Sequence, residues 1–401
     1  MRDTAGSPAA SEPVVSLGDL TRLFLRLGLT AFGGPAAHIA MMQEEIVERR
    51  KWLTKEEFLD LLGASNLVPG PSSTELAIHI GFRLAGWQGL LLAGTCFILP
   101  AFLLVLGIAW VYVRFGRLPQ VAGVLYGVKP VVIAVVLQAL WNLGRTALKT
   151  RFLAGVGLVA TMVAFLNVSP LLILFGVGAL NGGRQWLTAR EKGGAGPLFA
   201  LLGLIAALVA LPLALGSVAT ASPMIELKSI FLIFLKFGSI VYGSGYVLLA
   251  FLRADLVARL HWLTSTQLLD AVAIGQVTPG PVFTTATFIG FILGGPRGAI
   301  VATVGMFLPA FLLVAVSGPL VPRLRKSPLA GAFLDGVNAA SLALMAVVTW
   351  ELGRASLVDG ITIVLALTSA LLLLRFRINS LWLVLGGAAV GLLVSLLKMH
   401  R

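Results

Sequence analysis

The sequence LPAFLLV occupies residues 99–105 and returns letter for letter at residues 308–314. Outward from this heptapeptide, other landmarks recur in the same order about 210 positions apart, among them Pro-Gly-Pro at residues 69–71 and 279–281. The repeat is far longer than a solenoid unit, and a two-fold duplication inside an apolar chain is typical of membrane transporters. The alternative is a duplicated scaffold without a transport role.

The composition sets the class of protein. Hydrophobic residues make up 58% of the chain and charged residues 12%, and the mean hydropathy is +0.96. So few charges could not cover a soluble globule with polar surface, so we predict an all-α polytopic membrane protein. Stretches close to the length of about 20 apolar residues that crosses a bilayer occur at residues 90–113, 121–140 and 299–316, among others.

The positive charge of the chain does not indicate a nucleic-acid partner. The formal net charge is +13, but most cations stand between apolar segments, where a basic bias sets membrane orientation. Cys96, the only cysteine, leaves no disulfide and no thiolate metal site. Residues 1–16 are small and polar, which predicts a disordered tail instead of a cleaved signal peptide. We expect a multi-pass protein of a bacterial-type inner membrane, surrounded by the lipid bilayer. Whether two copies form a homodimer stays open.

Each half of the chain contains six apolar segments, and one unpaired stretch, residues 198–215, lies between the halves. We expect a first repeat at 17–183, a basic loop and linker transmembrane helix at 184–225, and a second repeat at 226–401. An even number of crossings plus one linker helix makes the repeats inverted. If segment two of each half is a re-entrant hairpin, the parity changes and the halves become parallel. The segments run over 23–42, 58–84, 88–113, 121–142, 152–166 and 169–181, and over 231–250, 268–293, 297–319, 330–353, 357–374 and 379–397.

Segments one and two of each half are broken helices, interrupted at matching places. Two prolines remove two backbone donors, and the glycine between them permits a sharp bend. Non-helical backbone at membrane depth is tolerated only where it is buried in protein or lines a wet cavity. The half-helix after each break has an N-terminus with about half a positive charge, a ready anion site. Kinking for packing alone is the alternative. The breaks are Gly33, Gly34 and Pro35 with Gly243 and Ser244, and Pro69, Gly70 and Pro71 with Pro279, Gly280 and Pro281.

Polar side chains stand beside both Pro-Gly-Pro breaks, and we predict that they line the anion site. Asn66 and its counterpart Gln276 could supply amide hydrogen bonds to an oxyanion. They could equally satisfy backbone groups that are freed at the break, and both readings stay open. The predicted polar lining comprises Asn66, Ser72, Ser73, Gln276, Thr278 and Thr284.

Cations inside the segments indicate that the ligand is an anion. Arg26 in segment one is replaced by Lys236 in the repeat, and Lys129 lies inside segment four. Charged groups within spans are costly and usually functional, so we predict that these three bind substrate. Arg22 fits snorkelling to the lipid headgroups as well as it fits a functional role.

Titratable groups within the segments are few and differ between the halves. Glu75 and His79 lie four residues apart on one helical face, a spacing that permits a proton-sharing pair or two metal ligands. No third ligand stands in register, which disfavours a metal site. The second repeat has Thr284 or Thr285 where Glu75 stands. Glu75, His79 and His38 have no like partner, and we take them as candidates for coupling transport to protons.

Together, these motifs resemble those of the chromate ion transporter family. The likeness runs from about Leu20 to Leu397 and fits the long, two-domain members of that family. It implies efflux of chromate from the cytoplasm, resistance to chromate, sulfate as a related oxyanion, and functional weight for both sets of breaks. Asn66 departs from the pattern, in which glutamine is common, while Gln276 keeps it. The matching motifs are residues 28–35 with His38, 47–53 and 68–73 in the first half, and 237–239, 242–246 and 276–281 in the second.

Chromate and sulfate are tetrahedral dianions, and the membrane potential itself favours their export. A dianion leaving a negative interior gains about 4.6 kcal/mol per 100 mV, so efflux needs no ATP, and the chain has no Walker motif. Import would require compensating protons or cations. A membrane enzyme acting on a lipid phosphate would need a convergent acid or base near the interface. A cation transporter would need carboxylates in both repeats, where only Asp60 and Asp270 recur. We therefore expect a transporter without enzymatic activity or cofactor, and the sequence does not separate chromate from sulfate.

Overall fold

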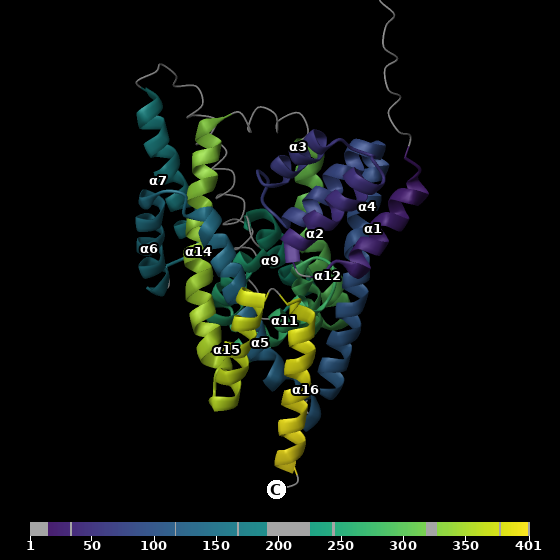
Figure 1. Cartoon of the computed structure of the whole chain (residues 1–401), viewed down its shortest axis with the longest axis vertical. Helices are drawn as coiled ribbons and strands as arrows, with labels where there is room; N and C mark the ends of the chain where they lie inside the picture. The colour runs from purple at the N-terminus through teal and green to yellow at the C-terminus, as the bar shows by residue number, and fades with distance from the viewer. Residues whose placement is uncertain are drawn as a thin grey trace, which may run out of the picture.

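A computed structural model describes residues 15–32, 34–116, 118–166, 168–190, 225–242, 245–317, 327–376 and 378–399. The linker stretch 198–215, nearly all of the predicted tail, and the break residues Gly33, Gly243 and Ser244 lie outside the described residues. Every element within them is a helix, which confirms the all-α class (Figure 1).

The helices form two sets that follow one another in the same order. The first half contains α1 (Leu17–Thr30), α2 (Gly34–Gln43), η1 (Glu44–Arg49), α3 (Lys55–Ser65), α4 (Ser72–Phe115), α5 (Pro119–Ala147), α6 (Arg151–Phe165) and α7 (Pro170–Arg190). The second half contains α9 (Leu227–Ile240), η2 (Gly245–Val247), α10 (Leu248–Leu252), η3 (Arg253–Arg259), α11 (Ser265–Val277), η4 (Val282–Thr284), α12 (Thr285–Ser317), α14 (Pro328–Ser356), α15 (Gly360–Phe376) and α16 (Ser380–Met399).

Five stretches of helix in the described part of the chain are long and apolar enough to cross a membrane. They are α4, α5, α14, most of α16, and the stretch Val282–Val316, which contains η4 and most of α12. Their hydropathy supports the prediction of a polytopic membrane protein.

The longest of these helices, α4, consists of two antiparallel arms. Ala85 and Gly86 have non-helical backbone angles, with φ of +58° at Gly86. Gly81 and Gly89 lie so close across the turn that a Cβ on either would strike the backbone of the other. The chain thus reverses where the sequence predicts the boundary between segments two and three. Gly295 in α12, with φ of +61°, makes the matching turn.

Segment two of the first repeat folds as a hairpin around its Pro-Gly-Pro break. α3 has 11 residues and is about 16 Å long, too short for a hydrocarbon core of about 30 Å. Arg83, at the end of the first arm of α4, lies 2.9 Å from Glu57 at the start of α3. The segment therefore enters and leaves at the same end, which favours the re-entrant alternative over a crossing. Inversion of the two halves depends on the linker outside the described residues and stays a prediction.

The two repeats exchange their last helices. α16 packs along α5 of the first repeat, and α6 and α7 pack along α14 of the second (Figure 1). Glycines permit the close approach, as in other small-residue helix crossings in membranes. A Cβ at Gly127 in α5 would strike the carbonyl of Gly387 in α16, and a Cβ at Gly336 in α14 would strike α7 at Val177. Because of this exchange, residues of both repeats line the space between them.

Candidate functional site

Each Pro-Gly-Pro break is hydrogen-bonded to the segment-one break of the other repeat. The backbone N–H of Gly70 donates to the carbonyl of Val241 at 2.7 Å, and the N–H of Gly280 donates to the carbonyl of Ala31 at 2.9 Å. Gly70 and Gly280 are counterparts, as are Ala31 and Val241. The four predicted breaks therefore meet in two crossed pairs that relate the halves by an approximate two-fold symmetry.

Local chemistry explains why these two bonds form. In a Pro-Gly-Pro tripeptide the glycine has the single N–H, and a buried N–H requires an acceptor. α1 and α9 end at the breaks in segment one, which places the carbonyls of Ala31 and Val241 there without a helical partner. Gly280 has φ of +86°, and a Cβ on it would lie 2.8 Å from the Cβ of Ala101. The position therefore requires glycine for both conformation and space.

His38 joins the two breaks of the first repeat. Its Nε2 lies 3.1 Å from the carbonyl of Ala31, and its Nδ1 lies 3.2 Å from Oγ of Ser73. A carbonyl only accepts, so Nε2 carries the hydrogen, and the Ser73 hydroxyl donates to Nδ1 in the neutral ring. The counterpart of His38 is Leu248, which forms no such bridge. The first repeat therefore has a polar link that the second lacks.

Glu75 lies against the first Pro-Gly-Pro break, and its carboxyl group is unpaired among the described residues. The side chain is fully buried, and neither carboxylate oxygen has a hydrogen-bond partner among the described residues. One of these oxygens is so close to Gly70 that a Cβ there would strike it. Thr74 Oγ1 and His79 Nε2 are also buried without a partner in the described part of the chain. Unsatisfied buried polar groups are rare in proteins, and a catalytic or binding role is one reason for their presence.

The second break has no such unmatched cluster of side chains in the residues that the structure describes. The hydroxyl of Thr284 donates to the carbonyl of Pro281 at 2.8 Å, and that of Thr285 donates to Val282 at 2.7 Å. Thr278 likewise donates to the carbonyl of Ile274 at 3.0 Å. The threonines of the second repeat satisfy local backbone groups, so the two breaks differ chemically.

The other residues that the sequence predicts at the anion site differ in burial. Ser72 is buried at the first turn of α4, and Asn66 is exposed at the end of α3, where its N–H bonds to Leu62. Gln276 is half-buried in the last turn of α11. Gly34, with φ of +78°, and Pro35 begin α2.

Arg26 and Lys236 form equivalent ion pairs at the π-helices. Arg26 lies 3.4 Å from Glu45 in η1, and Lys236 lies 2.6 Å from Asp255 in η3. Each carboxylate also contacts an arginine four residues later in its helix, Arg49 at 2.9 Å and Arg259 at 2.7 Å. Sequence reasoning missed both carboxylates, although Glu45 and Asp255 stand at matching positions of the two halves. The first cluster also includes Arg50, 3.5 Å from Glu45, and Glu44, 2.7 Å from Arg49. Three cations therefore face two carboxylates in the first cluster and two face one in the second, so each retains one positive charge.

Lys129 forms an ion pair between the repeats. Its Nζ lies 2.9 Å from Oδ1 of Asp270 in α11, and the hydroxyl of Tyr112 donates to Oδ2 of the same carboxylate at 2.8 Å. Asp270, which the sequence places near a loop, is almost completely buried. All three predicted cations thus have a carboxylate partner in this structure.

The chain is similar to a family of membrane transporters along most of its length. A family model described as Chromate transporter matches it twice, at residues 18–182 and 228–392. A chromate transport protein of Cupriavidus metallidurans is 35% identical over 402 residues, 99% of this chain and 98% of that protein. A chromate transport protein of Pseudomonas aeruginosa is 32% identical over 98% of this chain and 95% of its own length. A probable chromate transport protein of Synechococcus elongatus is 34% identical over 86% and 87%, respectively. No solved structure matches the chain.

Proposed function

Because the chain belongs to the chromate transporter family, we propose that it carries chromate across the membrane and binds it at the crossed breaks. The observation that supports this proposal best is the pair of hydrogen bonds from Gly70 to Val241 and from Gly280 to Ala31. These bonds join unwound backbone of the two repeats, so a movement of one repeat against the other changes the site directly. Such a movement would give alternating access.

Donors at the first break would contact the oxyanion. Ser72 and Ser73 are in the first turn of α4, where backbone N–H groups lack partners within the helix. A tetrahedral dianion accepts several hydrogen bonds, which suits converging amides and hydroxyls better than a carboxylate cage. The hydroxyls of Thr278 and Thr284 must first release backbone carbonyls, and that of Ser73 must release His38, before they can donate to a substrate. We therefore assign the first contact to the backbone N–H groups of Ser72 and Ser73.

The paired cations would contribute in two ways. Lys129 and Asp270 belong to different repeats, so a movement of one repeat against the other would separate the two side chains. Lys129 would then be free to bind the substrate. The pairs of Arg26 and Lys236 lie within single repeats and would stay closed. Their clusters each retain one positive charge, which attracts a dianion toward the breaks.

We propose that chromate moves out of the cytoplasm across the inner membrane. The potential contributes about 4.6 kcal/mol per 100 mV to the export of a dianion, and opposes import by the same amount. Export of a toxic oxyanion would give the cell chromate resistance.

Glu75 would couple this export to protons. An ionised carboxylate beside Gly70 repels a dianion, whereas a protonated one donates a hydrogen bond to it. The anion and a proton would therefore bind together and move in the same direction. His79 on the same helix face and Tyr242, which follows Val241 at the crossed break, are titratable groups near it. His38 would hold the two breaks of the first repeat together.

Chromate uptake into inverted membrane vesicles tests the proposal, with the potential and the pH gradient clamped separately. In an inverted vesicle the interior corresponds to the outside of the cell, so export from the cell becomes uptake into the vesicle. A positive interior attracts the dianion and should therefore accelerate chromate uptake. Uptake that is independent of the potential, or no uptake above protein-free vesicles, would contradict export. Added sulfate measures whether the related dianion competes for the same site.

A further inference from the structure

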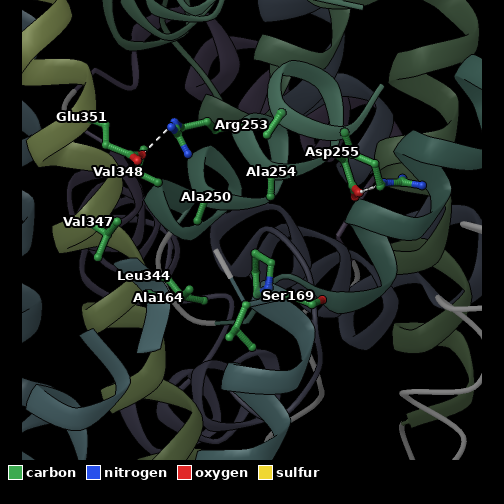
Figure 2. Close-up of a pocket in the computed structure, with 14 residues that line it drawn as sticks. Ala164, Ser169, Ala250, Arg253, Ala254, Asp255, Leu344, Val347, Val348 and Glu351 are labelled. Atoms are coloured by element: carbon green, nitrogen blue, oxygen red, sulfur yellow. Dashed lines mark hydrogen bonds and ion pairs between the residues drawn. The ribbon is translucent and has the colours of Figure 1, made fainter. Parts of the chain in front are cut away.

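A cavity of about 320 Å³ lies between the two repeats and shares no lining residue with the crossed breaks. Its walls come from the turn between α6 and α7 in the first repeat and from η3 and α14 in the second. Figure 2 shows Arg253 and Asp255 of η3 above the cavity, Glu351 of α14 at one side and Ser169 below. The cavity is at the small end of the range of about 300–1,000 Å³ for ligand sites, which suits a small ligand.

Two arginines and two carboxylates line this cavity. Nε of Arg253 lies 2.7 Å from Oε2 of Glu351, and Arg259 and Lys236 share the carboxylate of Asp255. The two arginines are thus matched in number by the two carboxylates, and Lys236, which pairs with Asp255 from outside the lining, leaves the group with one positive charge in excess. Arg253 makes no other ion pair or hydrogen bond to the described residues, so the Nη groups of its guanidinium keep donors for a ligand.

The N-terminus of α7 points to the same kind of ligand. Ser169 and Pro170 line the cavity, and α7 begins at Pro170. The first amides of a helix carry partial positive charge and have no helical acceptor. The dipole of α7 therefore adds to the field of the two arginines, and the Ser169 hydroxyl offers another donor.

The Arg253–Glu351 pair is present in one repeat only. By the alignment of the halves, Arg253 corresponds to Gln43 and Glu351 to Asn142, whereas Asp255 and Arg259 keep acidic and basic counterparts in Glu45 and Arg49. The pair is therefore not required by the fold that the two repeats share.

We propose that this cavity is a second site for a tetrahedral dianion, in which Arg253 exchanges the carboxylate of Glu351 for the anion. The identity of the ion, chromate or sulfate, rests on the proposed function. Glu351 is then an internal competitor that releases the anion when it returns to Arg253. Arg259 and the Ser169 hydroxyl complete the donors.

Site-specific labelling tests this proposal. Ser169→Cys in a Cys96→Ala background is treated with an anionic thiol reagent, in detergent-purified protein, over a range of sulfate concentrations. Sulfate is the probe because chromate oxidises thiols. Arg253→Gln should raise the half-protecting sulfate concentration about tenfold or more, the loss expected for a hydrogen bond to a charged group. Glu351→Gln should lower it, because the competitor is removed.

Opposite shifts in these two variants distinguish a binding site from a structural ion pair. Misfolding cannot produce tighter protection, so the Glu351→Gln result stands even if Arg253→Gln folds poorly. Lys149→Gln is the matched control, since Lys149 pairs with Asp335 across the repeats at 2.7 Å outside the cavity. It should leave the half-protecting concentration unchanged.

Absence of protection by sulfate, or equal shifts in the same direction in both variants, overturns the proposal. Labelling that is blocked in phosphatidylglycerol nanodiscs regardless of sulfate, but free in detergent, would assign the cavity to a lipid phosphate and also overturn it. Protection without chromate flux in vesicles would contradict the proposed function while the second site stands.

Discussion

Lys129 and Asp270 belong to different repeats, yet Nζ of the lysine lies 2.9 Å from Oδ1 of the aspartate in a nearly buried ion pair. Breaking such a pair from one side leaves an uncompensated buried charge, which costs about 3–5 kcal/mol. Lys129→Ala alone should therefore lower the unfolding temperature in detergent and abolish chromate flux in proteoliposomes. The double variant Lys129→Ala/Asp270→Ala should regain thermal stability but not flux, if Lys129 also serves the substrate. If the double variant recovers both flux and stability, Lys129 has a structural role and does not bind the substrate.

Gly280 should not tolerate a side chain. Its φ of +86° disfavours any L-residue by about 1–2 kcal/mol, and the added Cβ would lie 2.8 Å from Ala101. Gly280→Ala should therefore displace the N–H from the carbonyl of Ala31 and reduce chromate flux at least about tenfold, since two effects combine. Gly86→Ala is the control, because Gly86 also has positive φ, +58°, but no atom near its would-be Cβ. Equal losses in the two variants would show that backbone strain, and not the crossed break, is responsible.

The repeats and breaks were predictable because their signals are local. Pro-Gly-Pro interrupts a helix wherever it stands, and a fixed offset shows that the interruption occurs twice. The crossing of Gly70 with Val241, and the exchange of α7 and α16 between repeats, could not be read in this way. Apolar periodicity indicates which residues are buried but not which helix covers them.

The sequence indicates some of the carboxylates that pair with the cations. The alignment that pairs Arg26 with Lys236 also pairs Glu45 with Asp255, so the acidic match is visible in the sequence. The π-helices that hold these carboxylates have no comparable sequence signal. The sequence pattern predicts that Asp270 lies near a loop, because the residue is close to the start of a segment. The hairpin fold instead buries it beside Lys129.

Glu57 should make the stability of the first repeat depend on acidic pH. The N–H of Thr54 donates to its carboxylate, and with further bonds from the Thr54 hydroxyl and Arg83 it lowers the pKa of Glu57 below the usual value. A depressed folded pKa stabilises the protein above the unfolded pKa and loses this effect as pH falls through the folded value.

Glu57→Gln is a natural test of that dependence, because Gln267 forms the same capping box with Thr264 in the second repeat. The variant should keep the cap and lose at most about 1 kcal/mol at neutral pH, since the pair with Arg83 is exposed. Urea unfolding monitored by circular dichroism should show that the difference from wild type disappears near pH 3. A difference that persists there would have to come from the cap itself.

Glu75→Gln should separate anion movement from proton movement. If a proton accompanies each chromate ion, the wild type exports about one negative charge per ion, and the potential contributes about 2.3 kcal/mol per 100 mV. Glutamine keeps a hydrogen-bond donor beside Gly70 but carries no exchangeable charge, so the variant should move about two charges and gain about 4.6 kcal/mol. The reversal potential of chromate flux in proteoliposomes measures this number, and the variant's value should no longer depend on the pH gradient. Thr285→Ala, at one of the two positions that can match Glu75 in the second repeat, should behave as the wild type, because its hydroxyl bonds to the carbonyl of Val282. A proton flux that opposes chromate in the wild type, or that survives in Glu75→Gln, would place the coupling group elsewhere.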